Sequence, residues 1–146
     1  MRFENQLKFF LSVVPPTVTQ QEHKVSVNRK TGKVIFYDPP ELKTARALFT
    51  DYVAMHKPDR PINGTVQLVT KWIWPAGDKH RDGEYKTTKP DTDNLIKLFK
   101  DCLTRAGFWR DDAQVASEVT EKFWGMTPGV YVEINTEEKA YGKTSN

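Results

Sequence analysis

Residues 89–115, KPDTDNLIKLFKDCLTRAGFWRDDAQV, decide how this chain folds. Apolar residues recur there at spacings of three and four, which places them on one stripe of an amphipathic helix. They are Leu95, Leu98, Phe99, Cys102, Leu103 and Ala106. Asp91 or Asp93 can cap the start, because a short side-chain oxygen accepts hydrogen bonds from amides of the first turn. Gly107 suits the end, since glycine adopts the left-handed conformation without penalty. The pattern predicts a helix from about residue 93 to about residue 106.

The start of this helix carries more acidic side chains than a helix needs. Asp93, Lys97 and Asp101 form an i, i+4, i+8 row on the polar side, and as charge pairs they would contribute a few tenths of a kcal/mol each. Asp91 is not explained in this way, because one cap is enough. Two carboxylates about 5 Å apart repel by roughly 3 kcal/mol at an effective dielectric near 20. A divalent cation such as Mg²⁺ would turn this repulsion into coordination, so the pair predicts a metal site.

A second acidic pair, Asp111 and Asp112, follows the helix after a short turn. A helix of about 14 residues is roughly 20 Å long, so the two pairs cannot meet through the helix itself. Two arrangements remain open. Either the turn and the next strand double back along the helix, or a partner subunit supplies the second carboxylate.

This stretch resembles the RusA-type Holliday junction resolvases. KPDTDNLIKLFKDCL is similar to the family's D-x-D-N-L-x-K helix start, and AGFWRDDAQV is similar to its A-G-F-W-x-D-D-A-Q-V segment. The resemblance implies that Asp91, Asp93 and Asp112 are the metal-binding catalytic carboxylates, and that Lys97 is also needed for cleavage. It further implies a small homodimeric nuclease that depends on Mg²⁺ or Mn²⁺ and resolves four-way DNA junctions, usually in phage or prophage recombination.

The composition agrees with such a protein without predicting it. The chain has 146 residues, 38% of them hydrophobic, and a net charge of +3, which suits one domain and permits a polyanionic partner. Its single cysteine, Cys102, lies on the apolar stripe and suggests a reducing compartment. The apolar run at residues 9–14 is too short for a signal peptide or a membrane span. We expect an intracellular, cytoplasmic protein that has no membrane partner.

The other segments predict a scaffold of strands and one further helix. We expect strands at about 6–14, 65–74, 113–124 and 130–135, a hairpin at 24–37 and a helix at about 38–56. The first strand is apolar on both faces, which predicts an interior position, whereas the last strand alternates as a half-buried edge strand does. Trp72 and Trp74 share one face of their strand, where they either pack in the core or a dimer interface or stack on unpaired bases; packing is the commoner role.

The expected architecture is a single α+β domain over residues 1–136, with a mixed sheet of four to six strands and two helices packed on it. A polar C-terminal tail, residues 137–146, should be frayed.

Two basic segments are candidates for contacts with DNA phosphates. The tip of the hairpin holds clustered cations, and so does the stretch 75–89, which has no periodicity and predicts a mobile loop that leads into Asp91. An exposed turn and a solvated loop are the simpler interpretations. The candidate contacts are Arg29, Lys30, Lys79, Arg81, Lys86 and Lys89.

Together these features predict a Mg²⁺-dependent endodeoxyribonuclease that resolves Holliday junctions by paired symmetric nicks, in recombination and repair. Asp111 should be a supporting or capping residue, and Asp101 a structural partner of Lys97. A DNA-binding accessory protein that does not cut is the alternative. Such a protein would lack one or more of the residues Asp91, Asp93, Lys97 and Asp112, all of which are present here. A structural module whose helix caps imitate metal ligands is a third interpretation, and it would not respond to metal.

Overall fold

The structure is a computed structural model that describes residues 3–17, 24–27, 30–32, 34–37 and 40–137. The elements in chain order are β1 (Asn5–Leu11), β2 (Lys24–Val27), β3 (Val34–Tyr37), α1 (Pro40–Ala54), β4 (Val66–Pro75), α2 (Thr92–Ala106), the short 3-10 helix η1 (Asp112–Gln114), β5 (Val115–Gly125) and β6 (Gly129–Thr136). The expected α+β domain, with two helices on a mixed sheet, is confirmed. The expected tail lies outside the described residues from position 138 onward.

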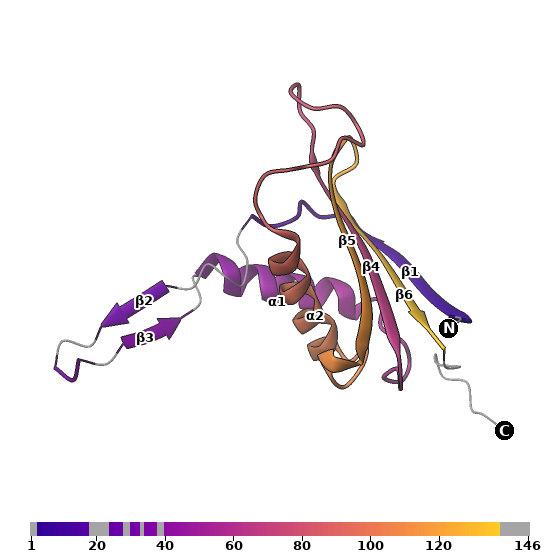
Figure 1. Ribbon diagram of the computed structural model, residues 1–146, viewed down its shortest axis with the longest axis horizontal. Coiled ribbons are helices and arrows are strands. Elements are labelled where there is room, and N and C mark those ends of the chain that lie inside the picture. Colours follow the sequence, from indigo (N-terminus) through magenta and orange to yellow (C-terminus); the bar gives the residue numbers. More distant parts are fainter. Residues whose placement is uncertain (1–2, 18–23, 28–29, 33, 38–39, 138–146) are drawn as a thin grey trace.

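The main sheet has four strands in the order β1-β6-β4-β5. β4 and β5 are parallel and α2 connects them, while the other neighbours are antiparallel. β2 and β3 form a separate antiparallel ribbon, as the hairpin pattern predicted. Both helices lie on one side of the main sheet, and the ribbon projects from the start of α1 (Figure 1). α2 therefore packs beside α1 on this side of the sheet and contacts β5 (Figure 1).

Two strand positions differ from the expectation. β1 is an edge strand, and β6 is an interior strand that pairs with both β1 and β4. The apolar residues on both faces of β1 have another cause: a Cβ atom on Gly129 would lie 2.2 Å from a ring carbon of Phe10, so this ring packs directly on the glycine. The contact is made across the strand pair, which local hydrophobicity does not reveal.

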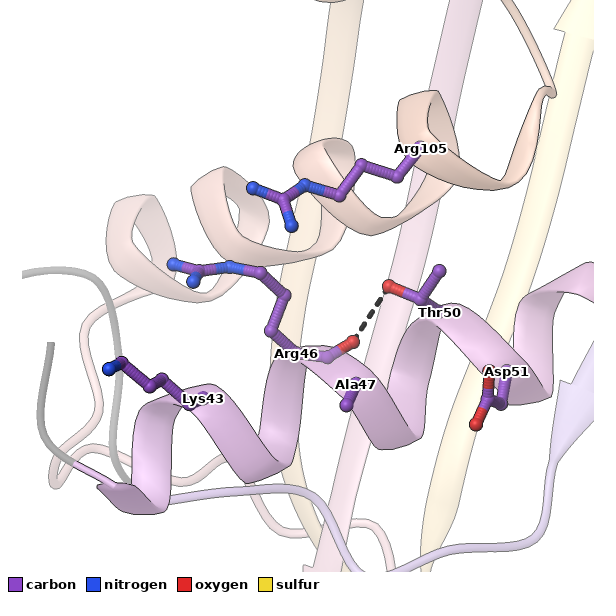
Figure 2. Close-up of a pocket in the computed structure, with 6 residues that line it drawn as sticks. All are labelled: Lys43, Arg46, Ala47, Thr50, Asp51 and Arg105. Atoms are coloured by element: carbon purple, nitrogen blue, oxygen red, sulfur yellow. Dashed lines mark hydrogen bonds between the residues drawn. The ribbon is translucent and has the colours of Figure 1, made fainter.

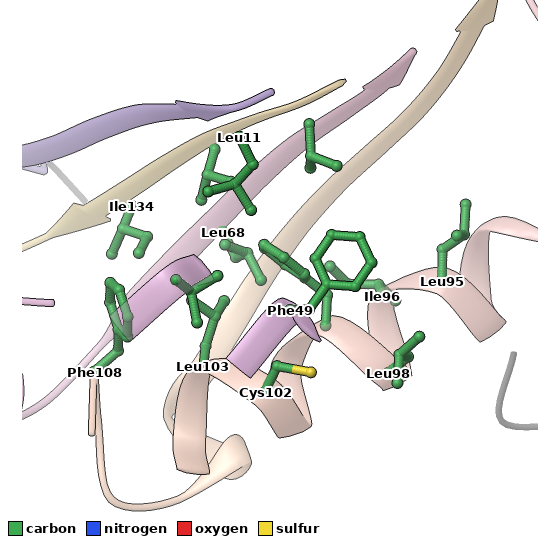
Figure 3. Packing of buried hydrophobic residues seen from close by; sticks show 14 of the residues in the cluster. Leu11, Phe49, Leu68, Leu95, Ile96, Leu98, Cys102, Leu103, Phe108 and Ile134 are labelled. Carbon is green, nitrogen blue, oxygen red and sulfur yellow. The ribbon is translucent and has the colours of Figure 1, made fainter. Parts of the chain in front are cut away.

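The core fills the space between the sheet and the two helices (Figure 3). Trp72 is fully buried, and its ring centroid lies 5.9 Å from that of Phe49 on α1 and 5.2 Å from that of Phe99 on α2. Trp74 is 4% exposed. The core role predicted for both tryptophans is confirmed, and neither presents a face on which a base could stack.

The segment before α2 is a loop, as its composition predicted, but residues 83–86 pair with β5. Gly83 N donates to Trp124 O at 2.8 Å, and Trp124 N donates to Glu84 O at 2.8 Å. Lys86 N then donates to Lys122 O at 2.9 Å. Residues 83–86 thus run along the end of β5 and form one isolated bridge there, between Tyr85 and Phe123. Their partners lie about 40 residues further along the chain, where a local pattern cannot reveal them.

Within the described residues, no helix has the length and apolar character needed to cross a bilayer.

Candidate active site

Asp91 and Asp93 stand at the start of α2. Asp91 is the N-cap residue, with extended backbone angles (φ −71°, ψ 149°), yet its side chain makes no capping hydrogen bond. Both side chains are exposed, and neither carboxylate has a hydrogen bond or ion pair with another described residue. The interpretation of these aspartates as simple helix caps therefore loses its main support, because their oxygens are available to a ligand.

A shallow pocket of about 270 Å³ opens beside Asp93, and its other lining residues are Thr92, Ile96, Glu118 and Thr120. Glu118 and Thr120 reach it because β5 returns along α2 with these side chains on the helix side of the sheet. Sequence reasoning missed Glu118, although the alternation of residues 115–124 places it on the same face as Thr120. Its carboxylate lies 2.6 Å from Lys100 Nζ, so its charge already has a partner.

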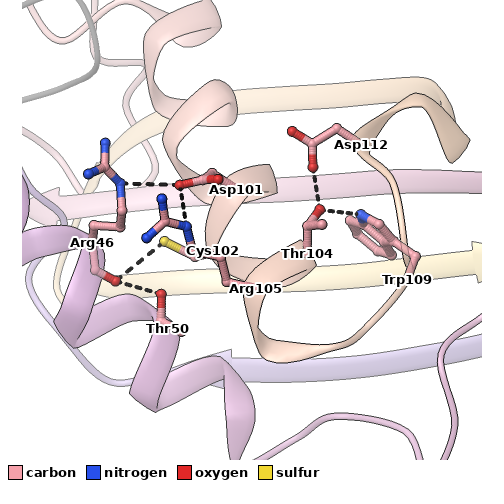
Figure 4. Close-up of polar contacts among 8 residues, drawn as sticks. All are labelled: Arg46, Thr50, Asp101, Cys102, Thr104, Arg105, Trp109 and Asp112. Carbon is pink, nitrogen blue, oxygen red and sulfur yellow. Dashed lines mark hydrogen bonds and ion pairs between the residues drawn. The ribbon is translucent and has the colours of Figure 1, made fainter.

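Asp112 lies at the opposite end of α2. Thr104 Oγ1 donates a hydrogen bond to Asp112 Oδ1 and accepts one from Trp109 Nε1 at 2.8 Å (Figure 4). Thr104 is eleven residues beyond Asp93, a rise of about 16 Å. The described residues accordingly contain no group of three or more His, Cys, Asp or Glu able to hold a metal ion.

This geometry separates the two arrangements that the sequence left open. The chain does double back, but β5 begins only after Asp112. The side chains that it carries to the start of α2 are those of Glu118, Thr120 and Lys122. A single protomer therefore holds Asp91 and Asp93 at one end of the helix and Asp112 at the other.

Two supporting aspartates can be assigned. Asp111 accepts a hydrogen bond from Ala113 N at 2.9 Å and forms a capping box with Gln114, so the capping role is confirmed. Asp101 does not pair with Lys97. Its Oδ2 lies 3.2 Å from Arg46 Nε and 3.1 Å from Arg105 Nε, because α1 packs beside α2 and brings Arg46 to it (Figure 4).

The same helix pair forms a pocket of about 410 Å³ (Figure 2). Lys43, Arg46 and Arg105 line it, together with Asp51. Three cations thus meet in one depression. Sequence reasoning did not find this group, because its members come from two helices separated by about 50 residues.

The cations expected to contact DNA differ in exposure. Lys30 is exposed in the turn between β2 and β3, and Lys79, Arg81 and Lys89 are exposed before α2. Arg29 lies outside the described residues.

Lys86 is different, with only 7% of its surface exposed. Its Nζ lies 4.2 Å from the ring centroid of Trp124 and donates to Thr88 Oγ1 at 2.6 Å. Burial, and then the nearby charge of Lys122, lowers the pKa of Lys86. This lysine packs in the interior of the segment and presents little surface to a phosphate.

Comparison with known proteins identifies the relatives of this chain. The family model described as Endodeoxyribonuclease RusA matches residues 14–135. The chain is 32% identical to the uncharacterized protein YqaN of Bacillus subtilis, over 72% of this chain and 81% of that protein. It is 28% identical to the crossover junction endodeoxyribonuclease rusA of Lactococcus phage r1t, over 79% of this chain and 83% of the phage protein. The chain belongs to the RusA endodeoxyribonuclease family.

Proposed function

We propose that this protein is a metal-dependent endodeoxyribonuclease that resolves four-way DNA junctions by paired symmetric nicks, in recombination and repair. One observation carries the proposal. Asp91 and Asp93, at the positions of the family motif, present two neighbouring carboxylates that no described residue engages. Helix capping alone does not explain a pair of this kind.

The donor set suits a hard divalent cation. Mg²⁺ takes carboxylate oxygens and keeps several waters, which leaves room for a phosphate, and Mn²⁺ accepts similar ligands. Asp91, Asp93 and Asp112 would hold the ion. When bound, it would polarise the scissile phosphate and lower the pKa of the attacking water. Lys97 is exposed one helical turn after Asp93, and its charge would stabilise negative charge that develops on the phosphate.

Asp112 would join this site across a dimer interface. Eleven residues at about 100° per residue bring Thr104, which holds Asp112, to within about 20° of Asp93 around the helix axis. Asp93 and Asp112 therefore both lie on the same outward side of α2, at opposite ends of the helix. A two-fold axis across this side would place Asp112 of the partner subunit beside Asp91 and Asp93. It would create two equivalent sites, as paired nicks require.

The exposed cations are the proposed contacts with the DNA backbone. Lys79, Arg81 and Lys89 lie in the segment that leads into Asp91, and Lys30 lies on the projecting ribbon. Arg29, next to Lys30 in the sequence, stays in this set. Because phosphate contacts supply affinity without sequence information, substitution of these residues should weaken the binding of all DNA alike.

Cleavage of a labelled four-way junction, beside a linear duplex of the same sequence, tests the proposal. We expect symmetric nicks confined to the junction with Mg²⁺ and no nicks with EDTA. Tight junction binding without cleavage, in either Mg²⁺ or Mn²⁺, would instead identify a DNA-binding accessory protein. An absence of both binding and cleavage would contradict both functions.

A further inference from the structure

Two lysines converge on the residues that lead into α2. Lys122 Nζ, from β5, donates hydrogen bonds to Thr88 O and to Pro90 O, both at 2.7 Å. Lys86 Nζ donates to the hydroxyl of the same threonine at 2.6 Å. Pro90 is buried and immediately precedes Asp91. The ammonium group of Lys122 therefore holds the backbone just before Asp91, and that of Lys86 holds the Thr88 side chain.

We propose that Lys122 is a positioning residue for the Asp91–Asp93 pair and thereby sets the affinity of this pair for a divalent cation. The inference rests on the proposed function of these aspartates. It assigns to Lys122 neither a contact with DNA nor a contact with the metal.

The backbone around Pro90 has little other support. The last main-chain hydrogen bond before it is that from Lys86 N to Lys122 O, and the next is that from Leu95 N to Asp91 O at 3.1 Å. Between them, the described residues provide no backbone partner for residues 87–90. Proline has no amide hydrogen to donate. The two bonds from Lys122 are therefore the hydrogen bonds that the main-chain oxygens of this segment receive.

Lys122 can act as an anchor because its own position is fixed by the sheet. Its backbone is paired in register with that of Trp72 on β4, and Trp72 is fully buried in the core. Its main-chain oxygen and its side chain both hold the segment, one at Lys86 and the other at Thr88 and Pro90. Lys122 thus connects the parallel strands to Pro90, the residue that immediately precedes Asp91.

The chemistry of lysine suits this task. An ammonium group offers three donors that rotate freely, and two of them are directed at carbonyl oxygens here. Hydrogen bonds from a charged donor are shorter and stronger than those from a neutral one. Methionine has a side chain of similar length without any donor. An arginine keeps the charge but presents a planar fork, which matches the two carbonyl oxygens of Thr88 and Pro90 less well.

Binding of Mn²⁺ to the full-length protein, measured by titration with electron paramagnetic resonance detection of the free ion, tests the inference without requiring cleavage. We expect Lys122→Met to raise the Kd for Mn²⁺ at least tenfold and Lys122→Arg to recover part of the affinity. Junction binding in EDTA should stay within about twofold of wild type. Lys71→Met is the matched control, because Lys71 is exposed on the opposite face of the same sheet, and it should leave the Kd unchanged.

Three results would overturn the inference. The first is an unchanged Mn²⁺ affinity in folded Lys122→Met, and the second is an equal loss in Lys71→Met. The third is a loss of junction binding in EDTA as large as the loss of metal binding, which would make Lys122 a DNA contact. If Lys122→Met does not fold, Lys122→Gln retains a donor and undergoes the same titration. A wild-type protein that binds no Mn²⁺ would instead refute the proposed metal site itself.

Discussion

Thr104 Oγ1 donates a hydrogen bond to Asp112 Oδ1 at the last turn of α2. The same hydroxyl accepts a hydrogen bond from Trp109 Nε1, and Trp109 is 1% exposed. Asp112 is therefore connected to the core at the helix end opposite to Asp91 and Asp93. If the three aspartates share one metal site, two copies of the chain must build it.

Mixed dimers provide a direct test of a shared site. Asp93→Asn and Asp112→Asn should each abolish cleavage. When the two variants are mixed and exchange subunits, each mixed dimer contains one site with both substitutions and one site with neither. Nicking at one strand should therefore reappear, measured on a labelled junction under denaturing electrophoresis. If mixed dimers form and no nicks return, each site belongs to a single subunit.

Asp93→Asn should separate binding from cleavage. Removal of one charge relieves the repulsion between neighbouring carboxylates and toward DNA phosphates, while it takes a ligand from the metal. We expect cleavage to fall at least about 100-fold, whereas junction affinity in EDTA stays equal or improves. Asp59→Asn, at an exposed position after α1, is the control and should cleave normally. Normal cleavage by Asp93→Asn would remove this residue from the site.

Asp101 should support the stability of the fold and Lys97 should support cleavage, although both lie in the same row on α2. Asp101 bridges Arg46 and Arg105, and the Arg46 side chain is only 13% exposed. We expect Asp101→Asn to lower the free energy of unfolding by about 1–2 kcal/mol in urea titrations, with cleavage per folded molecule retained. Lys97→Met should leave stability unchanged and reduce cleavage. Equal stability losses in the two variants would contradict this division.

Cys102 should be an unreactive thiol in the folded protein. It is fully buried, and burial raises its pKa to about 11. At pH 8 only about one thiol in a thousand would be ionised, so alkylation by iodoacetamide should be slow until urea unfolds the chain. Because the folded thiol holds its proton more tightly than the unfolded one, this group favours unfolding as the pH rises from about 9 to about 11. Rapid alkylation of the native protein would contradict its burial.

Local sequence determined the elements that depend on neighbouring residues. The apolar spacing and Gly107 predicted α2 to within a residue at each end, and Gly107 has the expected left-handed φ of 96°. Alternation predicted β4 and the burial of Trp72. The acidic pair at the start of α2 was also visible, because a helix start and its D-x-D pattern lie within one short segment.

Only the tertiary structure decided which distant residues meet. It made β1 an edge strand and β6 an interior strand. It also placed Arg46 in an ion pair with Asp101 and buried Lys86 against the ring of Trp124. It also carried Glu118 and Lys122 to the start of α2 while it left Asp112 at the far end. Periodicity reports which face of an element is apolar, but it does not report the order of strands or the point at which the chain reverses. Strand order and chain reversal depend on packing between segments far apart in the sequence. In this chain they leave Asp91 and Asp93 at one end of α2 and Asp112 at the other.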